Sequence, residues 1–107
     1  MTHVVFSEAA RLDRRQITAY TVEHFGVDQA RRLRARFQTT LRKLARSPLV
    51  GRSNTELDPP GRSFRYAVVM KSFIVVYESF DDGIRVARLL HGARGLAAEL
   101  DRDPGDD

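Results

Sequence analysis

The sequence predicts an α+β fold, in which an N-terminal strand and an antiparallel helical hairpin pack on a small antiparallel sheet. Two long amphipathic segments follow a short apolar run, and only Gly26 and its neighbours separate them. Three strand-like runs with tight turns follow in the last third of the chain. A chain of 107 residues has room for a single domain with one modest core. The predicted order is therefore β-α-α-β-β-β, followed by a short C-terminal helix.

The first strand and the first helix are predicted at the start of the chain. The apolar run HVVF at residues 3–6 is typical of a short strand. Ser7 suits the N-cap position, because its side-chain oxygen can accept a hydrogen bond from the first helical turn. The helix is expected to end near Phe25, since Gly26 tolerates the left-handed conformation that stops a helix. Asp13 falls inside the apolar stripe of this helix, so its carboxylate needs a partner, most simply an arginine from elsewhere in the fold.

The second helix is predicted from near Val27 to just before Pro48, which cannot easily continue it. Its apolar residues recur every three to four positions, as a core-facing helix requires. Its outer face carries seven cations and no acid between positions 29 and 46: Arg31, Arg32, Arg34, Arg36, Arg42, Lys43 and Arg46. This face could bind nucleic acid or an acidic partner, although most charge runs are solvated helix faces. The apolar edges of the hairpin and sheet could hold a partner's helix or strand.

The sheet is predicted to follow a loop at residues 47–63, which is rich in proline, glycine and polar residues. The predicted strands span residues 64–70, 73–80 and 84–91. The dipeptide Asp82-Gly83 indicates a tight hairpin turn, because glycine tolerates a positive φ.

The C-terminal end differs from the rest of the chain in charge. A short helix is predicted at residues 93–100 and an acidic flexible tail at 101–107, so residues 1–100 form the single domain. Residues 99–107 contribute a charge of −4, so residues 1–98 carry a net charge of +8, although the whole chain has +4. A domain this basic attracts nucleic acid, or an acidic protein that shields it.

Composition excludes several classes of site. The chain has no cysteine, which excludes disulfides and thiolate metal sites and indicates a reducing cytoplasm. His3, His24 and His91 lack metal-ligand spacing, so neither a metal nor another cofactor is predicted. No apolar run approaches the roughly 20 residues that cross a bilayer, so no membrane association is expected.

Several short motifs occur in the order and spacing of one known family. They are Phe6-Ser7-Glu8-Ala9-Ala10, Asp13, Ile17, Tyr20, Phe25-Gly26, Leu44-Ala45, Pro48, Gly51-Arg52, Glu56-Leu57, Gly61-Arg62-Ser63-Phe64-Arg65, Ser72-Phe73-Ile74-Val75-Val76-Tyr77, Asp82-Gly83-Ile84 and Arg88-Leu89-Leu90-His91-Gly92-Ala93-Arg94. On these residues the chain resembles the ParE branch of the RelE/ParE toxins over roughly residues 3–98. It departs from that family at Arg14, where these toxins often carry an apolar residue, and the departure predicts looser helix packing there.

The resemblance implies the toxin of a type II toxin–antitoxin pair. Such toxins are neutralised by direct binding of a cognate antitoxin, here expected to be ParD-like and to form a hetero-oligomer with the toxin. ParE-like members are associated with poisoning DNA gyrase, whereas RelE-like members cut mRNA on the ribosome. The expectation is a non-enzymatic gyrase inhibitor. The alternatives are a ribosome-dependent mRNA endonuclease, and a degenerate member that only binds antitoxin or regulates its own expression.

The candidate target-binding residues are the cationic and histidine side chains of the last third: Arg62, Arg65, Lys71, Arg88, His91 and Arg94. In an mRNA endonuclease, Arg65, Arg88 and His91 would be catalytic, because RNA cleavage needs proton transfer and cations on the phosphate. This catalytic complement is thin, which favours gyrase as the target. Structural roles compete with these functional ones, since Arg88 could instead pair with Asp13 or Glu78, and His91 could satisfy backbone groups at a strand end.

Overall fold

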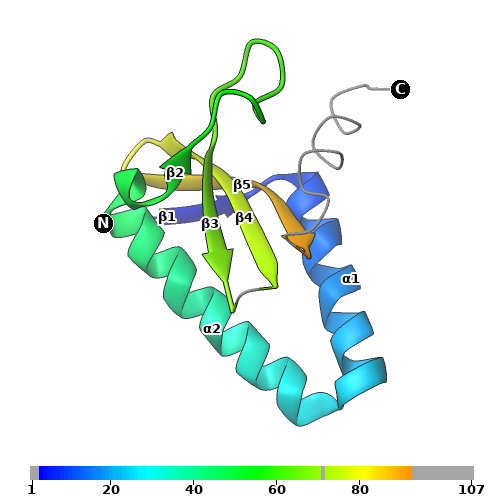
Figure 1. Cartoon of the computed structure of the whole chain (residues 1–107). Coiled ribbons are helices and arrows are strands. Elements are labelled where there is room, and N and C mark those ends of the chain that lie inside the picture. The colour runs from blue at the N-terminus through cyan, green and yellow to red at the C-terminus, as the bar shows by residue number, and fades with distance from the viewer. Residues whose placement is uncertain (1–2, 71, 93–107) are drawn as a thin grey trace.

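The computed structural model describes residues 3–70 and 72–92, and it shows a helical hairpin on one face of a sheet (Figure 1). The elements are β1 (His3–Phe6), α1 (Glu8–Phe25), α2 (Val27–Arg46), the 3₁₀ helix η1 (Pro48–Val50), β2 (Arg52–Ser53), β3 (Arg65–Val69), β4 (Phe73–Phe80) and β5 (Gly83–His91). The predicted α+β class and the order of its main elements are therefore confirmed. The predicted helix at 93–100 and the tail at 101–107 lie outside the described residues.

The sheet has five strands in the order β1-β5-β4-β3-β2. The three predicted C-terminal strands form its antiparallel centre, as expected. Two details differ from the prediction. β1 pairs in parallel with β5, with Phe6 opposite Val86, so the complete sheet is mixed. The predicted loop at 47–63 contains η1 and the two-residue strand β2, in which Arg52 pairs with Tyr66 of β3.

The helix boundaries follow the signals in the sequence. The Ser7 side chain accepts a hydrogen bond from the backbone N–H of Ala10 at 3.0 Å, which caps α1. Gly26 has a φ of 91° and donates its N–H to the carbonyl of Val22, so one glycine ends α1 and begins α2. This single-residue connection makes the two helices sequential neighbours that run in opposite directions.

The main core lies between the hairpin and the sheet. It combines one side of α2, including Leu33, Phe37 and Leu41, with inward-facing residues of β4 and β5. A second apolar cluster on the sheet includes Phe64 and Tyr66. Phe64, Phe73 and Tyr77 are all buried, so these aromatic residues pack in the core.

Candidate functional site

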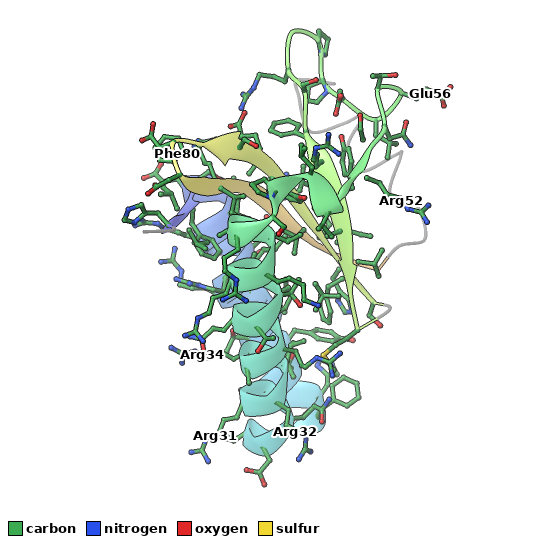
Figure 2. All side chains as sticks on the ribbon, turned by 90° about the vertical axis from the view of Figure 1, so that its left-hand side faces the viewer. Arg31, Arg32, Arg34, Arg52, Glu56 and Phe80 are labelled. Carbon is green, nitrogen blue, oxygen red and sulfur yellow. The ribbon has the colours of Figure 1, made fainter. Side chains whose placement is uncertain are left out.

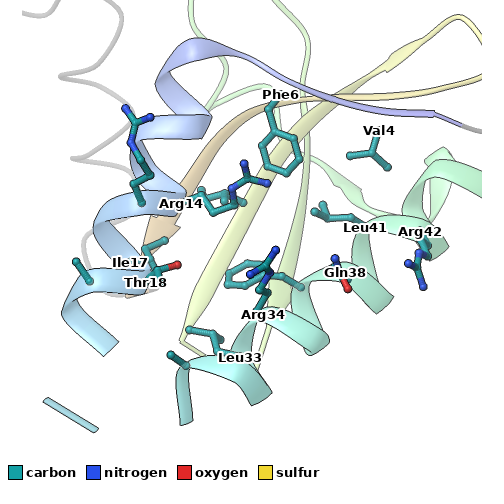
Figure 3. Close-up of a pocket in the computed structure, with 15 residues that line it drawn as sticks. Val4, Phe6, Arg14, Ile17, Thr18, Leu33, Arg34, Gln38, Leu41 and Arg42 are labelled. Carbon is teal, nitrogen blue, oxygen red and sulfur yellow. The ribbon is translucent and has the colours of Figure 1, made fainter. Parts of the chain in front are cut away.

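A groove lies between the two helices. The helices meet at Gly26 and diverge toward the sheet, and the space between them has a volume of about 710 Å³ (Figures 1 and 3). Val4 and Phe6 of β1 line it on the sheet side, while Ile17 of α1 and Leu33 of α2 line its walls. We call this feature the hairpin groove, and its volume lies within the range of about 300–1,000 Å³ that is typical of binding cavities.

The groove stays open because α1 places few large apolar side chains opposite α2. The buried positions of α1 include Ala10, Asp13 and Thr21, which are small or polar. Arg14 and Thr18, one helical turn apart, line the groove instead of filling it. The open space between α1 and α2 at Arg14 agrees with the looser helix packing expected at this position.

The lining of the groove is positively charged. Arg14 and Arg15 come from α1, Arg34 and Arg42 come from α2, and no acidic residue is among the lining residues. Arg14 lies over the ring of Phe6, with 4.6 Å between its guanidinium carbon and the ring centroid, which is a cation–π contact. The groove thus combines an apolar interior with cationic walls, a combination that suits an amphipathic acidic partner.

Arg88 is tied to the first helix. Asp13 accepts hydrogen bonds from Arg88 Nε at 2.7 Å, from Arg88 Nη2 at 3.1 Å and from the backbone N–H of Leu89 at 2.9 Å. The Asp13 side chain is only 10% exposed, and that of Arg88 is 26% exposed. The prediction that Asp13 pairs with an arginine is confirmed. Of the two acids considered for Arg88, the structure selects Asp13 rather than Glu78.

Arg65 and Tyr77 fix the segment that leads into β2. Arg65 Nη1 donates to the carbonyl of Gly51 at 2.8 Å. The Tyr77 hydroxyl donates to the carbonyl of Pro48 at 2.6 Å and accepts from the N–H of Gly51 at 2.9 Å. Tyr77 is completely buried, and this burial raises the pKa of its hydroxyl. Both side chains therefore satisfy backbone groups of a loop, which the sequence did not reveal.

Arg62 belongs to a cluster at the far end of β4. Glu78 Oε2 accepts from Arg62 Nη2 at 3.0 Å and from Arg85 Nη1 at 3.1 Å. Arg62 also lies over the ring of Phe64, with its guanidinium carbon 4.8 Å from the ring centroid. Its side chain is nevertheless 47% exposed, so it remains accessible to a partner.

His91 lies at the opposite end of the sheet, where it joins an aromatic group. Its ring stacks on Phe73 with centroids 4.6 Å apart, and it meets Tyr20 edge-on at 5.4 Å. Tyr20 in turn stacks on His24 at 4.1 Å. The residue is exposed, so the ring packs against neighbours without being enclosed.

The predicted target-binding residues are spread over the sheet rather than gathered at one point. Phe73 pairs with His91, and Tyr77 pairs with Arg65, so these two candidates lie four positions apart along β4. At about 3.4 Å per residue, that separation is roughly 14 Å along the strand. Lys71 and Arg94 lie outside the described residues.

Within residues 3–70 and 72–92, no group of three or more His, Cys, Asp or Glu side chains could hold a metal ion. In the same part of the chain, no helix has the length and apolar character needed to span a membrane.

Comparison with known proteins identifies the family. Residues 4–96 match the family described as the ParE toxin of the type II toxin–antitoxin system parDE. Among solved structures, the chain is similar to one described as the chromosomal ParDE TA system from P. aeruginosa, with a TM-score of 0.68 and 16% sequence identity. That match covers 86% of this chain and 97% of the other, and at this identity it shows the shared fold. No curated protein matches the chain.

Proposed function

Because the chain belongs to the ParE family of type II toxin–antitoxin systems, we propose that it inhibits DNA gyrase and that a ParD-like antitoxin neutralises it. In this proposal the toxin and its cognate antitoxin form a hetero-oligomer in the cytoplasm. The hairpin groove is the observation that carries the antitoxin part of the proposal, because it is a large and mainly apolar cavity whose walls are cationic.

The groove suits a helix of the antitoxin. In helix-in-groove recognition, an amphipathic helix buries apolar residues spaced three to four positions apart while its polar side remains at the rim. Phe6, Ile17 and Leu33 offer the apolar contacts. Arg15 and Arg42, together with the net charge of +8 on residues 1–98, favour an acidic helix.

A non-enzymatic role is supported because several side chains that could take part in RNA cleavage already make hydrogen bonds or ion pairs within the fold. Arg88 is held by Asp13, and Arg65 is held by a backbone carbonyl. Tyr77 is completely buried and its hydroxyl already makes two hydrogen bonds. Reassigning these groups to RNA cleavage would disrupt contacts that stabilise the fold, so inhibition by binding is the simpler proposal.

For the target, the sequence suggests six candidates: Arg62, Arg65, Lys71, Arg88, His91 and Arg94. Of these, we assign Arg88 to the fold, because Asp13 holds its guanidinium group. Among the described ones, Arg62 and His91 are the most accessible, whereas Arg65 and Arg88 are partly buried. We therefore expect Arg62→Ala and His91→Ala to weaken gyrase inhibition and to leave antitoxin affinity unchanged. Full inhibition by the folded double variant would place the target contact elsewhere.

The antitoxin part is tested by filling the groove. Ala30 of α2 lines the groove and is half-buried, whereas Ala35 on the same helix is exposed and does not line it. Ala30→Trp should block binding of the antitoxin encoded beside the toxin gene, and Ala35→Trp should bind it normally. Isothermal titration calorimetry with the purified proteins measures both. Equal affinity for the two variants would remove the groove from the interface.

The target is tested by gyrase supercoiling beside mRNA cleavage on programmed ribosomes, each with antitoxin added back. Gyrase inhibition with trapped cleaved DNA and intact mRNA is the expected result. Cleavage of mRNA without effect on gyrase would instead assign an endonuclease. Inactivity in both assays would overturn the proposed target.

A further inference from the structure

We infer that the hairpin groove recognises a carboxylate on the apolar side of the antitoxin helix, held between Arg14 and Arg34. The inference rests on the proposed function, because it specifies the chemistry by which the same groove selects its antitoxin. It assigns the two arginines a role in partner specificity.

The two arginines face the groove from its opposite walls. Arg14 extends from α1 and Arg34 from α2, and both side chains point into the space between the helices (Figure 3). The contact with the ring of Phe6 steadies the Arg14 guanidinium at the sheet side of the groove. Each guanidinium can donate two parallel hydrogen bonds to a carboxylate, a geometry that lysine does not offer.

Neither guanidinium has an anionic partner in the described part of the chain. No acidic side chain lies within ion-pair distance of Arg14 or Arg34 there. In the same structure, acids do accompany other arginines: Glu78 bridges two of them and Asp13 holds Arg88. The groove therefore lacks the neutralising charge that several arginines elsewhere in this fold possess.

This lack of an acid restricts what can occupy the groove. A helix with an entirely apolar side would cover both cations, and covering an unpaired charge is unfavourable. A single carboxylate among the apolar contacts could accept hydrogen bonds from both guanidinium groups and offset part of their charge, while the rest of the helix buries Ile17 and Leu33. Nucleic acid fits less well, because its polar backbone does not gain from the apolar interior.

The outer face of α2 provides the comparison. Arg36 is exposed on α2 and does not line the groove, so it experiences only the general charge of the surface. Figure 2 shows other arginines of this helix, Arg31 and Arg32, extending into solvent near its start. Replacing one of the groove arginines should therefore have an effect that replacing Arg36 does not.

The test measures the affinity of the adjacent-gene antitoxin for variants in which arginine becomes methionine. Methionine keeps an apolar stem in the groove and removes the charge. Arg14→Met and Arg34→Met should each weaken binding by about tenfold to a hundredfold, as expected for the loss of charge-assisted hydrogen bonds. The double variant should lose far less than the product of the two effects, because both arginines hold the same carboxylate. Arg36→Met should bind as the parent protein does.

The carboxylate itself can be located by replacing the antitoxin's acidic residues with glutamine one at a time. One replacement should weaken binding to the parent toxin and should have little further effect on Arg14→Met. Thermal melts of the toxin variants confirm that reduced affinity does not arise from unfolding.

Three results would overturn the inference. Binding of Arg14→Met and Arg34→Met at parental affinity or tighter would show that the groove prefers an entirely apolar surface. An equal loss in Arg36→Met would indicate diffuse charge attraction. Absence of any glutamine replacement coupled to Arg14 would show that no single carboxylate is held. If the parent toxin does not bind the antitoxin at all, the proposed function itself fails. If the parent toxin binds and Ala30→Trp blocks that binding, the groove is the antitoxin site, and any of the three results above then contradicts only the recognition of a carboxylate.

Discussion

Replacing Arg88 with alanine is expected to destabilise the domain by about 3 kcal/mol, because the substitution leaves a buried carboxylate without its cation. The Asp13 side chain is 10% exposed and would keep only the hydrogen bond from the Leu89 backbone. Breaking a buried ion pair from one side costs about 3–5 kcal/mol. Because the Arg88 side chain is 26% exposed and solvent partly screens its charge, we expect a loss of stability at the lower end of this range. A domain of this size loses about 4–8 °C of melting temperature per kcal/mol, so the midpoint should fall by roughly 12–24 °C.

Urea unfolding followed by far-UV circular dichroism measures this loss, since the chain contains no tryptophan to serve as a fluorescent reporter. Arg36→Ala on the exposed side of α2 is the matched control and should change the free energy of unfolding by less than about 0.5 kcal/mol. The double variant Asp13→Ala/Arg88→Ala should lose less than the sum of its single changes, because no charge is then left unpaired. A loss below about 1 kcal/mol in Arg88→Ala would refute the view that this ion pair is buried and structural.

The same variant separates two explanations of reduced toxicity. If Arg88 acts through the fold, Arg88→Ala lowers the amount of folded toxin, but each folded molecule still inhibits gyrase. If Arg88 contacts the target, inhibition per folded molecule falls as well. Supercoiling assays at a low temperature, where the variant is folded by circular dichroism, distinguish these outcomes, and we expect inhibition per folded molecule to be retained.

Two further predictions concern the loop and the buried tyrosines. Gly51→Ala should cost about 3 kcal/mol in urea unfolding, because the added Cβ would overlap the Tyr77 hydroxyl and displace a buried ring. At Gly61 an added Cβ would meet no atom within 4 Å, but the residue has a φ of 77°, so Gly61→Ala should cost only the backbone strain of about 1 kcal/mol. Equal losses in the two variants would contradict the steric argument. Burial raises the pKa values of Tyr66 and Tyr77, so the folded state favours their neutral forms. Their contribution to the free energy of unfolding is therefore fully present below about pH 10, the ordinary pKa of tyrosine. Above that pH the unfolded chain ionises first, so the free energy of unfolding should fall as the pH rises, with a limiting slope of about 1.4 kcal/mol per pH unit from Tyr66. Tyr66→Phe should make the slope measured in urea titrations at alkaline pH clearly shallower, and an unchanged slope would show that Tyr66 does not contribute.

Local sequence signals were sufficient to locate most of the secondary structure. Ser7 and Gly26 mark the ends of α1 through the hydrogen-bonding capacity of one and the positive φ of the other. Spacing along α2 predicts which residues are buried, because a helix repeats every 3.6 residues. The same periodicity placed Asp13 in an apolar stripe, and an unpaired carboxylate there requires an arginine, which proved to be Arg88.

Features that depend on contacts between distant segments could not be predicted in this way. β2 is too short to have its own pattern and exists because it pairs with β3. The parallel pairing of β1 with β5 and the divergence of the two helices arise from the assembled fold. The hydrogen bond from Arg65 to the carbonyl of Gly51 could not be predicted either, because the sequence carries no signal for a bond to a backbone group of a distant loop.

The arginines of this toxin fall into two groups with different consequences for its regulation. Arg62, Arg65 and Arg88 have acidic or carbonyl partners within the described chain, so the sheet and its loops are complete without a second protein. Arg14 and Arg34 have no such acid and face an open apolar groove. Loss of an occupant would therefore expose the groove without breaking the contacts that maintain the fold. A toxin that becomes active when its antitoxin is removed must remain folded alone, and the ion pairs and hydrogen bonds of Arg62, Arg65 and Arg88 do not depend on an occupant of the groove.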